Sequence, residues 1–124
     1  MKVLRHTCVA MLAVVVTACE SQAPWPSSGV FVGYYQPGFE KSDFKPVGTP
    51  ERWWLSGNIK SVRDLFVAPS RNQPPKIKRP VYLVVRGSLS PVGRYGHLNQ
   101  YTRELSVVEV IEVREVKTDE IVVF

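Results

Sequence analysis

Two valine-rich runs, residues 80–89 and 103–116, constrain the fold more than any other feature of the chain. They read PVYLVVRGSL and RELSVVEVIEVREV, and β-branched side chains, which are stiff at χ1, favour extended strands. The apolar spacing of the second run would also suit a buried helix, but its β-branched content predicts a strand. Its imperfect alternation predicts a register break or apolar cover on both faces, and Gly87 predicts a bend or bulge in the first run. The chain is therefore expected to be mainly β.

Two further segments with the composition of strands precede these runs. Residues 30–47 are rich in aromatic and β-branched side chains, with a turn or bulge expected at Pro37 and Gly38. Residues 51–55, ERWWL, are expected to form a short strand. Neighbouring side chains of a strand point to opposite faces, so Trp53 and Trp54 cannot share one core unless both faces are covered. One of the two is therefore a candidate exposed aromatic.

One short helix is expected after this strand. Asn58 has the side chain of a helix N-cap, and apolar residues from Ile59 to Phe66 recur at helical spacing. Pro69 ends the pattern after about three turns. Residues 69–80, PSRNQPPKIKRP, are proline-rich and basic and are expected to form a loop.

The start of the chain carries the features of an export signal. A basic segment, MKVLR, precedes an apolar run from Cys8 to Val16, which is shorter than the roughly twenty residues that span a bilayer. The stretch from Val16 to Cys19, VTAC, resembles the lipobox of bacterial lipoproteins, although Leu is usual where Val16 stands. That resemblance implies a signal peptide over residues 1–18, cut before a cysteine that is acylated with palmitate or a similar chain. An ordinary signal peptide or a buried N-terminal helix is the alternative.

The lipobox resemblance also sets the organisation of the rest of the chain. Cys19 would carry the lipid, residues 19–30 would form a flexible tether, and residues 31–124 would form one small domain. Glu20 follows the cysteine, and a residue other than Asp there implies the outer membrane, on its periplasmic side, rather than the inner membrane. Because Cys8 leaves with the signal and Cys19 is acylated, the mature chain keeps no thiol for a disulfide, for catalysis or for a metal.

Charge is unevenly distributed along the domain. Residues 60–94 are strongly basic, whereas residues 104–120 are acidic. This asymmetry fits either a basic face for an anionic partner or a solvated loop beside an acidic strand.

The segment between the valine-rich runs, SPVGRYGHLNQYTREL, gathers the strongest candidate site residues. A catalytic His97 would need a nucleophile and an orienting partner, yet the one carboxylate close in sequence is Glu104 and no Ser-His-Asp spacing stands out. One histidine also cannot assemble a zinc site, so neither a metal nor a cofactor is expected. Pro91, Gly93 and Gly96 are instead typical of a tight connection. The segment is expected to be an ordered hairpin loop that can also present a binding surface.

The pattern of ERWWLSG, a short helix, the run from Val81 to Leu105 and a final valine-rich strand resembles small bacterial lipoproteins with an OB-like barrel. It is similar to the C-terminal domain of the NlpE-type envelope lipoproteins over about residues 31–116, most specifically from Gly87 to Leu98. The resemblance implies a mainly β, OB-like barrel with one short helix. The N-terminal NlpE domain, whose cysteine pair is associated with sensing, has no counterpart in this chain.

These features predict a non-enzymatic binding or assembly module for an envelope protein or an envelope polymer. OB barrels bind through one sheet face and the adjoining loops. Here the candidate binding surface comprises Trp53, Trp54, Arg86, Arg94, Tyr95, His97, Tyr101 and Arg103. The periplasmic compartment argues against nucleic acid as the partner. Two alternatives stay open: an envelope-stress or metal-handling accessory like NlpE, and a small periplasmic hydrolase that uses His97.

Overall fold

Both valine-rich runs form strands, and these strands pair with each other along most of their length. In the computed structural model, which describes residues 25–124, β4 (Val81–Leu89) and β5 (Glu104–Glu115) are antiparallel. Register shifts after Val84 and after Arg86 account for the imperfect alternation of β5. The second shift confirms the irregularity predicted at Gly87, where a Cβ would lie 2.3 Å from the Ser106 carbonyl oxygen. Residues 90–103 therefore form the connection of a hairpin, as predicted.

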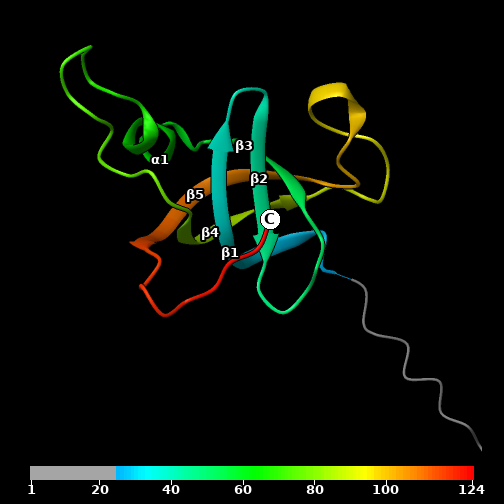
Figure 1. Cartoon of the computed structure of the whole chain (residues 1–124). Coiled ribbons are helices and arrows are strands. Elements are labelled where there is room, and N and C mark those ends of the chain that lie inside the picture. The colour runs from blue at the N-terminus through cyan, green and yellow to red at the C-terminus, as the bar shows by residue number, and fades with distance from the viewer. Residues whose placement is uncertain (1–24) are drawn as a thin grey trace, which may run out of the picture.

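Three more strands close the sheet into a barrel in the order β1-β2-β3-β5-β4 (Figure 1). They are β1 (Ser28–Gly38), β2 (Lys41–Pro46) and β3 (Trp53–Gly57), with α1 (Lys60–Arg63) and the 3-10 turn η1 (Asp64–Phe66) between β3 and β4. Residues 28–35 of β1 pair with β4, and residues 33–38 pair with β2. A parallel contact between β3 and β5 completes the closure. The domain is thus mainly β and forms an OB-like barrel with one short helix, which confirms the predicted fold class.

Aromatic side chains fill the barrel around Trp53. This indole is fully buried, stacks on Phe44 with ring centroids 6.0 Å apart, and meets Phe31 edge-on at 5.9 Å. Trp54, the next residue, lies on the opposite face of β3 and is only half-buried, as strand alternation requires. Trp53 was a candidate for the binding surface, and that assignment is wrong because the side chain belongs to the core.

The tether is shorter than predicted. Ser28 to Val30 belong to β1 and pair with residues of β4, so the barrel begins three positions before residue 31. Trp25 also contacts the domain, because its ring meets Trp53 edge-on at 4.8 Å and its indole N–H donates to Glu51 at 2.9 Å. The predicted signal peptide and residues 19–24 of the tether, Cys19 included, lie outside the described residues.

The helix after β3 differs from its prediction in cap and length. Ile59, not Asn58, occupies the N-cap position, and no side chain caps the helix. The Asn58 amide instead donates to the Val108 carbonyl oxygen on β5 at 3.2 Å. Helical structure covers only Lys60 to Phe66, less than the three turns expected, and the buried Ile59 and Val62 pack into the core.

Candidate functional site

The β4–β5 connection, residues 90–103, is an ordered loop held by its own backbone. Tyr95 and Tyr101 exchange two hydrogen bonds, with N–O distances of 2.8 and 3.1 Å. Gly96 has φ +69° and ψ −163°, a conformation that is almost restricted to glycine, and the 3-10 turn η2 (His97–Asn99) follows it. Gly93 does not have a positive φ. Of the two glycines in this loop, only Gly96 therefore adopts a backbone conformation that favours glycine.

Trp54 supports this loop from below. Its ring meets Tyr101 edge-on, with centroids 5.2 Å apart and an interplanar angle of 69°. The loop lies so close that a Cβ on Gly96 would be 2.5 Å from the indole Cε3 atom. The second tryptophan is therefore largely covered by the loop rather than displayed on the surface.

A buried carboxylate beneath the loop joins three segments of the chain: β2, the β2–β3 loop and the β4–β5 loop. Asp43 on β2 is 1% exposed, and the Tyr101 hydroxyl donates a hydrogen bond to its Oδ1 atom. Arg52 lies on the other side, with Nη1 3.5 Å from Oδ2. Burial and the hydrogen bond to Asp43 raise the pKa of Tyr101 to about 12, so its hydroxyl stays protonated and remains a donor at neutral pH. The Arg52 side chain is half exposed, so its remaining N–H groups face solvent.

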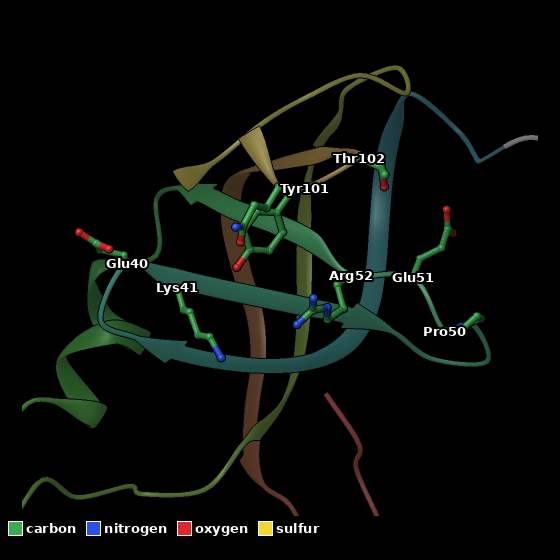
Figure 2. A pocket seen from close by; sticks show the side chains of 8 residues that line it. Glu40, Lys41, Pro50, Glu51, Arg52, Tyr101 and Thr102 are labelled. Carbon is green, nitrogen blue, oxygen red and sulfur yellow. The ribbon is translucent and has the colours of Figure 1, made fainter. Parts of the chain in front are cut away.

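Tyr101 and Arg52 border a cleft of the described domain, with a volume of about 610 Å³. Its walls come from the β1–β2 turn, the β2–β3 loop and the β4–β5 loop: Glu40, Lys41, Pro50, Glu51, Arg52, Gln100, Tyr101 and Thr102. Figure 2 shows Glu40 and Lys41 at one end, Pro50, Glu51 and Arg52 at the other, and Tyr101 and Thr102 along the side. Most of these side chains are exposed, so the cleft opens to solvent. It can hold a polar or charged group between its two ends.

A side-chain contact between His97 and Glu40 links the two loops at one end of this cleft. His97 Nε2 lies 2.8 Å from Glu40 Oε2, and the two side chains are 34% and 49% exposed. The pair ties the β1–β2 turn to the β4–β5 loop. It also gives His97 a carboxylate partner. This partner is Glu40 of the β1–β2 turn, and not Glu104, the carboxylate close to His97 in sequence.

The remaining predicted site residues are dispersed. Arg86 on β4 is paired with Glu109 on β5 and does not line the cleft. Arg94 is exposed and Tyr95 is half-buried in the loop. Arg103 donates to the Ser90 carbonyl oxygen at 3.0 Å and so stabilises the base of the loop. The structure thus brings together Trp54, Tyr95, His97 and Tyr101, but not Arg86 or Trp53.

Sequence reasoning missed Glu40, Lys41, Asp43, Glu51 and Arg52. One signal was present: Asp43 is a carboxylate in the middle of the β2 segment, KSDFKP, where a strand usually carries an apolar or uncharged side chain. Its partner Tyr101 lies 58 residues away, which no local pattern could reveal.

Within residues 25–124, no group of three or more His, Cys, Asp or Glu side chains is arranged to hold a metal ion. No helical segment in the same part of the chain is long and apolar enough to cross a bilayer. Comparison of the chain with protein-family models, curated proteins and solved structures finds no match. The case for function therefore comes from the residues of the site.

Proposed function

We propose that this protein is a lipid-anchored binding or assembly module on the periplasmic side of the outer membrane. The lipobox-like sequence ending in Cys19, followed by Glu20, supports the anchor and its location. The partner is an envelope protein or an envelope polymer, recognised through the cleft beside β2 and β3. The protein acts by binding and not by catalysis.

The position and content of the cleft carry this proposal. OB barrels bind ligands on the face of strands 2 and 3, between the β1–β2 and β4–β5 loops, and the cleft is bordered by the same two loops. Asp43 orients Arg52 from below, so that less side-chain freedom is lost when the guanidinium binds a ligand. Lys41 supplies a second cation in the wall, and the carboxylates of Glu40 and Glu51 are engaged by His97 and Trp25. The cleft offers both cationic and carboxylate side chains and is therefore suited to a strongly polar group.

A binding comparison of cleft variants tests the proposal. Full-length lipidated protein, affinity-tagged at its C-terminus, is incubated with purified sacculi and, separately, with solubilised envelope proteins. We expect Arg52→Ala to weaken retention of one of these by about tenfold, as for loss of a charged hot-spot residue. Arg71→Ala, on the exposed loop between η1 and β4, is the matched control and should bind like wild type. Equal binding by wild type and Arg52→Ala in both assays would reject the cleft as the site.

A small hydrolase is the second candidate, because His97 has the carboxylate partner that general bases use. This activity would require His97 to act on a water or hydroxyl in the cleft. His97→Gln should then abolish release of soluble fragments from sacculi without loss of binding. Under the binding proposal, neither the wild type nor the variant releases fragments.

A further inference from the structure

A row of four side chains crosses the outer face of the barrel, from β2 over β1 and β4 to β5. Tyr34 on β1 is the register partner of Lys45 on β2 and of Tyr82 on β4. Tyr82 is in turn the register partner of Arg114 on β5. Both tyrosines alternate with buried residues along their strands, so their side chains point away from the core. We call Lys45, Tyr34, Tyr82 and Arg114 the outer row.

Three side chains of the outer row are packed together. The guanidinium of Arg114 lies over the Tyr82 ring, 4.1 Å from the ring centroid. The rings of Tyr34 and Tyr82 meet edge-on, with centroids 6.0 Å apart. Because the guanidinium is already held on an aromatic face, it loses less side-chain freedom when it binds an anion. The row thus offers an ordered guanidinium, a tyrosine hydroxyl and the Lys45 ammonium, which are donors suited to a carboxylate and its neighbouring carbonyl groups.

The segment of the chain that follows β5, residues 116–124, occupies the outer row. Figure 1 shows this segment in red, ending beside β1 and β2. The Glu120 carboxylate accepts a hydrogen bond from Arg114 at 2.8 Å and another from the Tyr34 hydroxyl at 3.1 Å. The Lys45 ammonium donates to the main-chain carbonyl oxygen of Val123. The Arg114 hydrogen bond lowers the pKa of Glu120, so this carboxylate is charged at neutral pH.

Little besides these contacts holds the segment on the barrel. It forms no strand, since the pairing of β5 with β4 ends at Glu115. None of its residues belongs to the core cluster, and Ile121 and Val123 are 91% and 66% exposed. Ion pairs that remain partly exposed contribute little to stability. The segment can therefore leave the outer row while the barrel stays folded.

We propose that the outer row is a second binding site, for an acidic peptide segment of a partner protein, and that residues 116–124 occupy it in the free protein as a competing ligand. The contacts of the segment define the ligand. They are a side-chain carboxylate and, three residues later, a main-chain carbonyl oxygen, a spacing that a peptide has and a carbohydrate lacks. The two cations of the row favour an acidic peptide over a neutral one.

This site is separate from the cleft of the proposed function, which none of the four row residues lines. Because residues 116–124 are joined to β5, they compete at a high effective concentration, and a partner has to displace them. A change that releases the segment should therefore strengthen binding of an acidic peptide supplied in trans.

A synthetic copy of residues 118–124, TDEIVVF, is the probe for this site. The fluorescently labelled peptide is titrated with full-length protein, and binding is followed by fluorescence anisotropy. Glu120→Lys in the protein places an ammonium beside Arg114 and should expel the segment, so the peptide should bind this variant at least about tenfold more tightly than wild type. Asp119→Lys is the matched control: this neighbouring residue is exposed and makes none of the contacts above, so the variant should bind the peptide like wild type.

Further variants show whether the peptide occupies the outer row. A peptide that carries the change Glu120→Gln has the same apolar residues and should bind at least about tenfold more weakly. Added to Glu120→Lys, Tyr34→Phe and Arg114→Ala should each weaken peptide binding, and Arg52→Ala should leave it unchanged. Glu120→Gln in the protein removes the charge at nearly constant volume, and it replaces Glu120→Lys if that variant does not fold. A folded variant that binds the peptide no better than wild type, or equal binding of the two peptides, would overturn the proposal.

The remaining outcomes concern the identity of the ligand. Sedimentation of the wild type should show a monomer, and a dimer that Glu120→Lys dissociates would assign the row to a second copy of the chain and overturn the assignment to a partner protein. Retention on sacculi that rises in Glu120→Lys without any binding of the peptide would assign the row to a polymer and overturn it as well. Peptide binding that depends on Arg114 while Arg52→Ala changes neither retention assay would support this site and reject the cleft.

Discussion

Gly96 is a position where a single added methyl group should cost this domain much of its stability. Its backbone conformation, φ +69° and ψ −163°, is costly for any residue with a Cβ, by about 1–3 kcal/mol. The new Cβ would also lie 2.5 Å from the Trp54 ring and 2.8 Å from the Tyr101 ring. Moving packed rings costs about 1–3 kcal/mol more. Gly96→Ala should therefore lower the free energy of unfolding by about 2–6 kcal/mol, a large share of the about 5–15 kcal/mol typical of a domain.

Gly48→Ala provides the matched control. Gly48 also has positive φ, +81°, but a Cβ there would have no neighbour within 4 Å. It should therefore carry only a backbone cost of about 1–2 kcal/mol. Urea and thermal unfolding followed by circular dichroism would measure both variants. We expect Gly96→Ala to melt at least about 10 °C below wild type and clearly below Gly48→Ala. Equal destabilisation of the two variants would refute the close packing of the loop on Trp54.

Three further predictions concern the anchor, the cysteines and the buried tyrosine. Cys19→Ala should keep its signal segment and lose membrane association; a variant that stays in the membrane fraction and still incorporates labelled fatty acid would show that the anchor is wrongly assigned. Reducing agent should leave the melting temperature of the mature protein unchanged, because no thiol is left to form a disulfide, and a fall of several degrees would contradict the cysteine assignment. The pKa of Tyr101 is raised to about 12 from an unfolded value near 10, so its contribution to stability is present below pH 10 and lost as the pH rises to 12. Between pH 10 and 12, the free energy of unfolding should fall less steeply in Tyr101→Phe than in wild type. Identical pH profiles for variant and wild type would be inconsistent with the Asp43 hydrogen bond.

Much of the fold follows from local chemistry. The β-branched runs predicted β4 and β5, Gly87 predicted the irregularity between them, and the alternation rule placed Trp53 and Trp54 on opposite faces. Resemblance to OB-like lipoproteins supplied the barrel, which local patterns do not determine. The helix cap was predicted wrongly because a tertiary contact prevailed: the Asn58 amide bonds to β5 instead of to the helix.

The site was less predictable because its contacts are long-range. The hairpin loop and its glycine turn were recognised from residues 90–103, but its partners were not. Asp43, Arg52 and Glu40 reach Tyr101 and His97 only after β1 to β3 have wrapped around the barrel. Trp53 was proposed as a surface residue because the alternation rule cannot say which of two faces is the core.

Hydrogen exchange tests most directly whether a partner binds between the β1–β2 turn and the β4–β5 loop. Amide exchange of the full-length protein would be compared alone, with purified sacculi and with solubilised envelope proteins. We expect binding to slow amide exchange in residues 38–41 and 95–102, with little change in residues 108–115 of β5. Protection confined to β5, or to the loop between η1 and β4, with none at the two cleft loops, would contradict it.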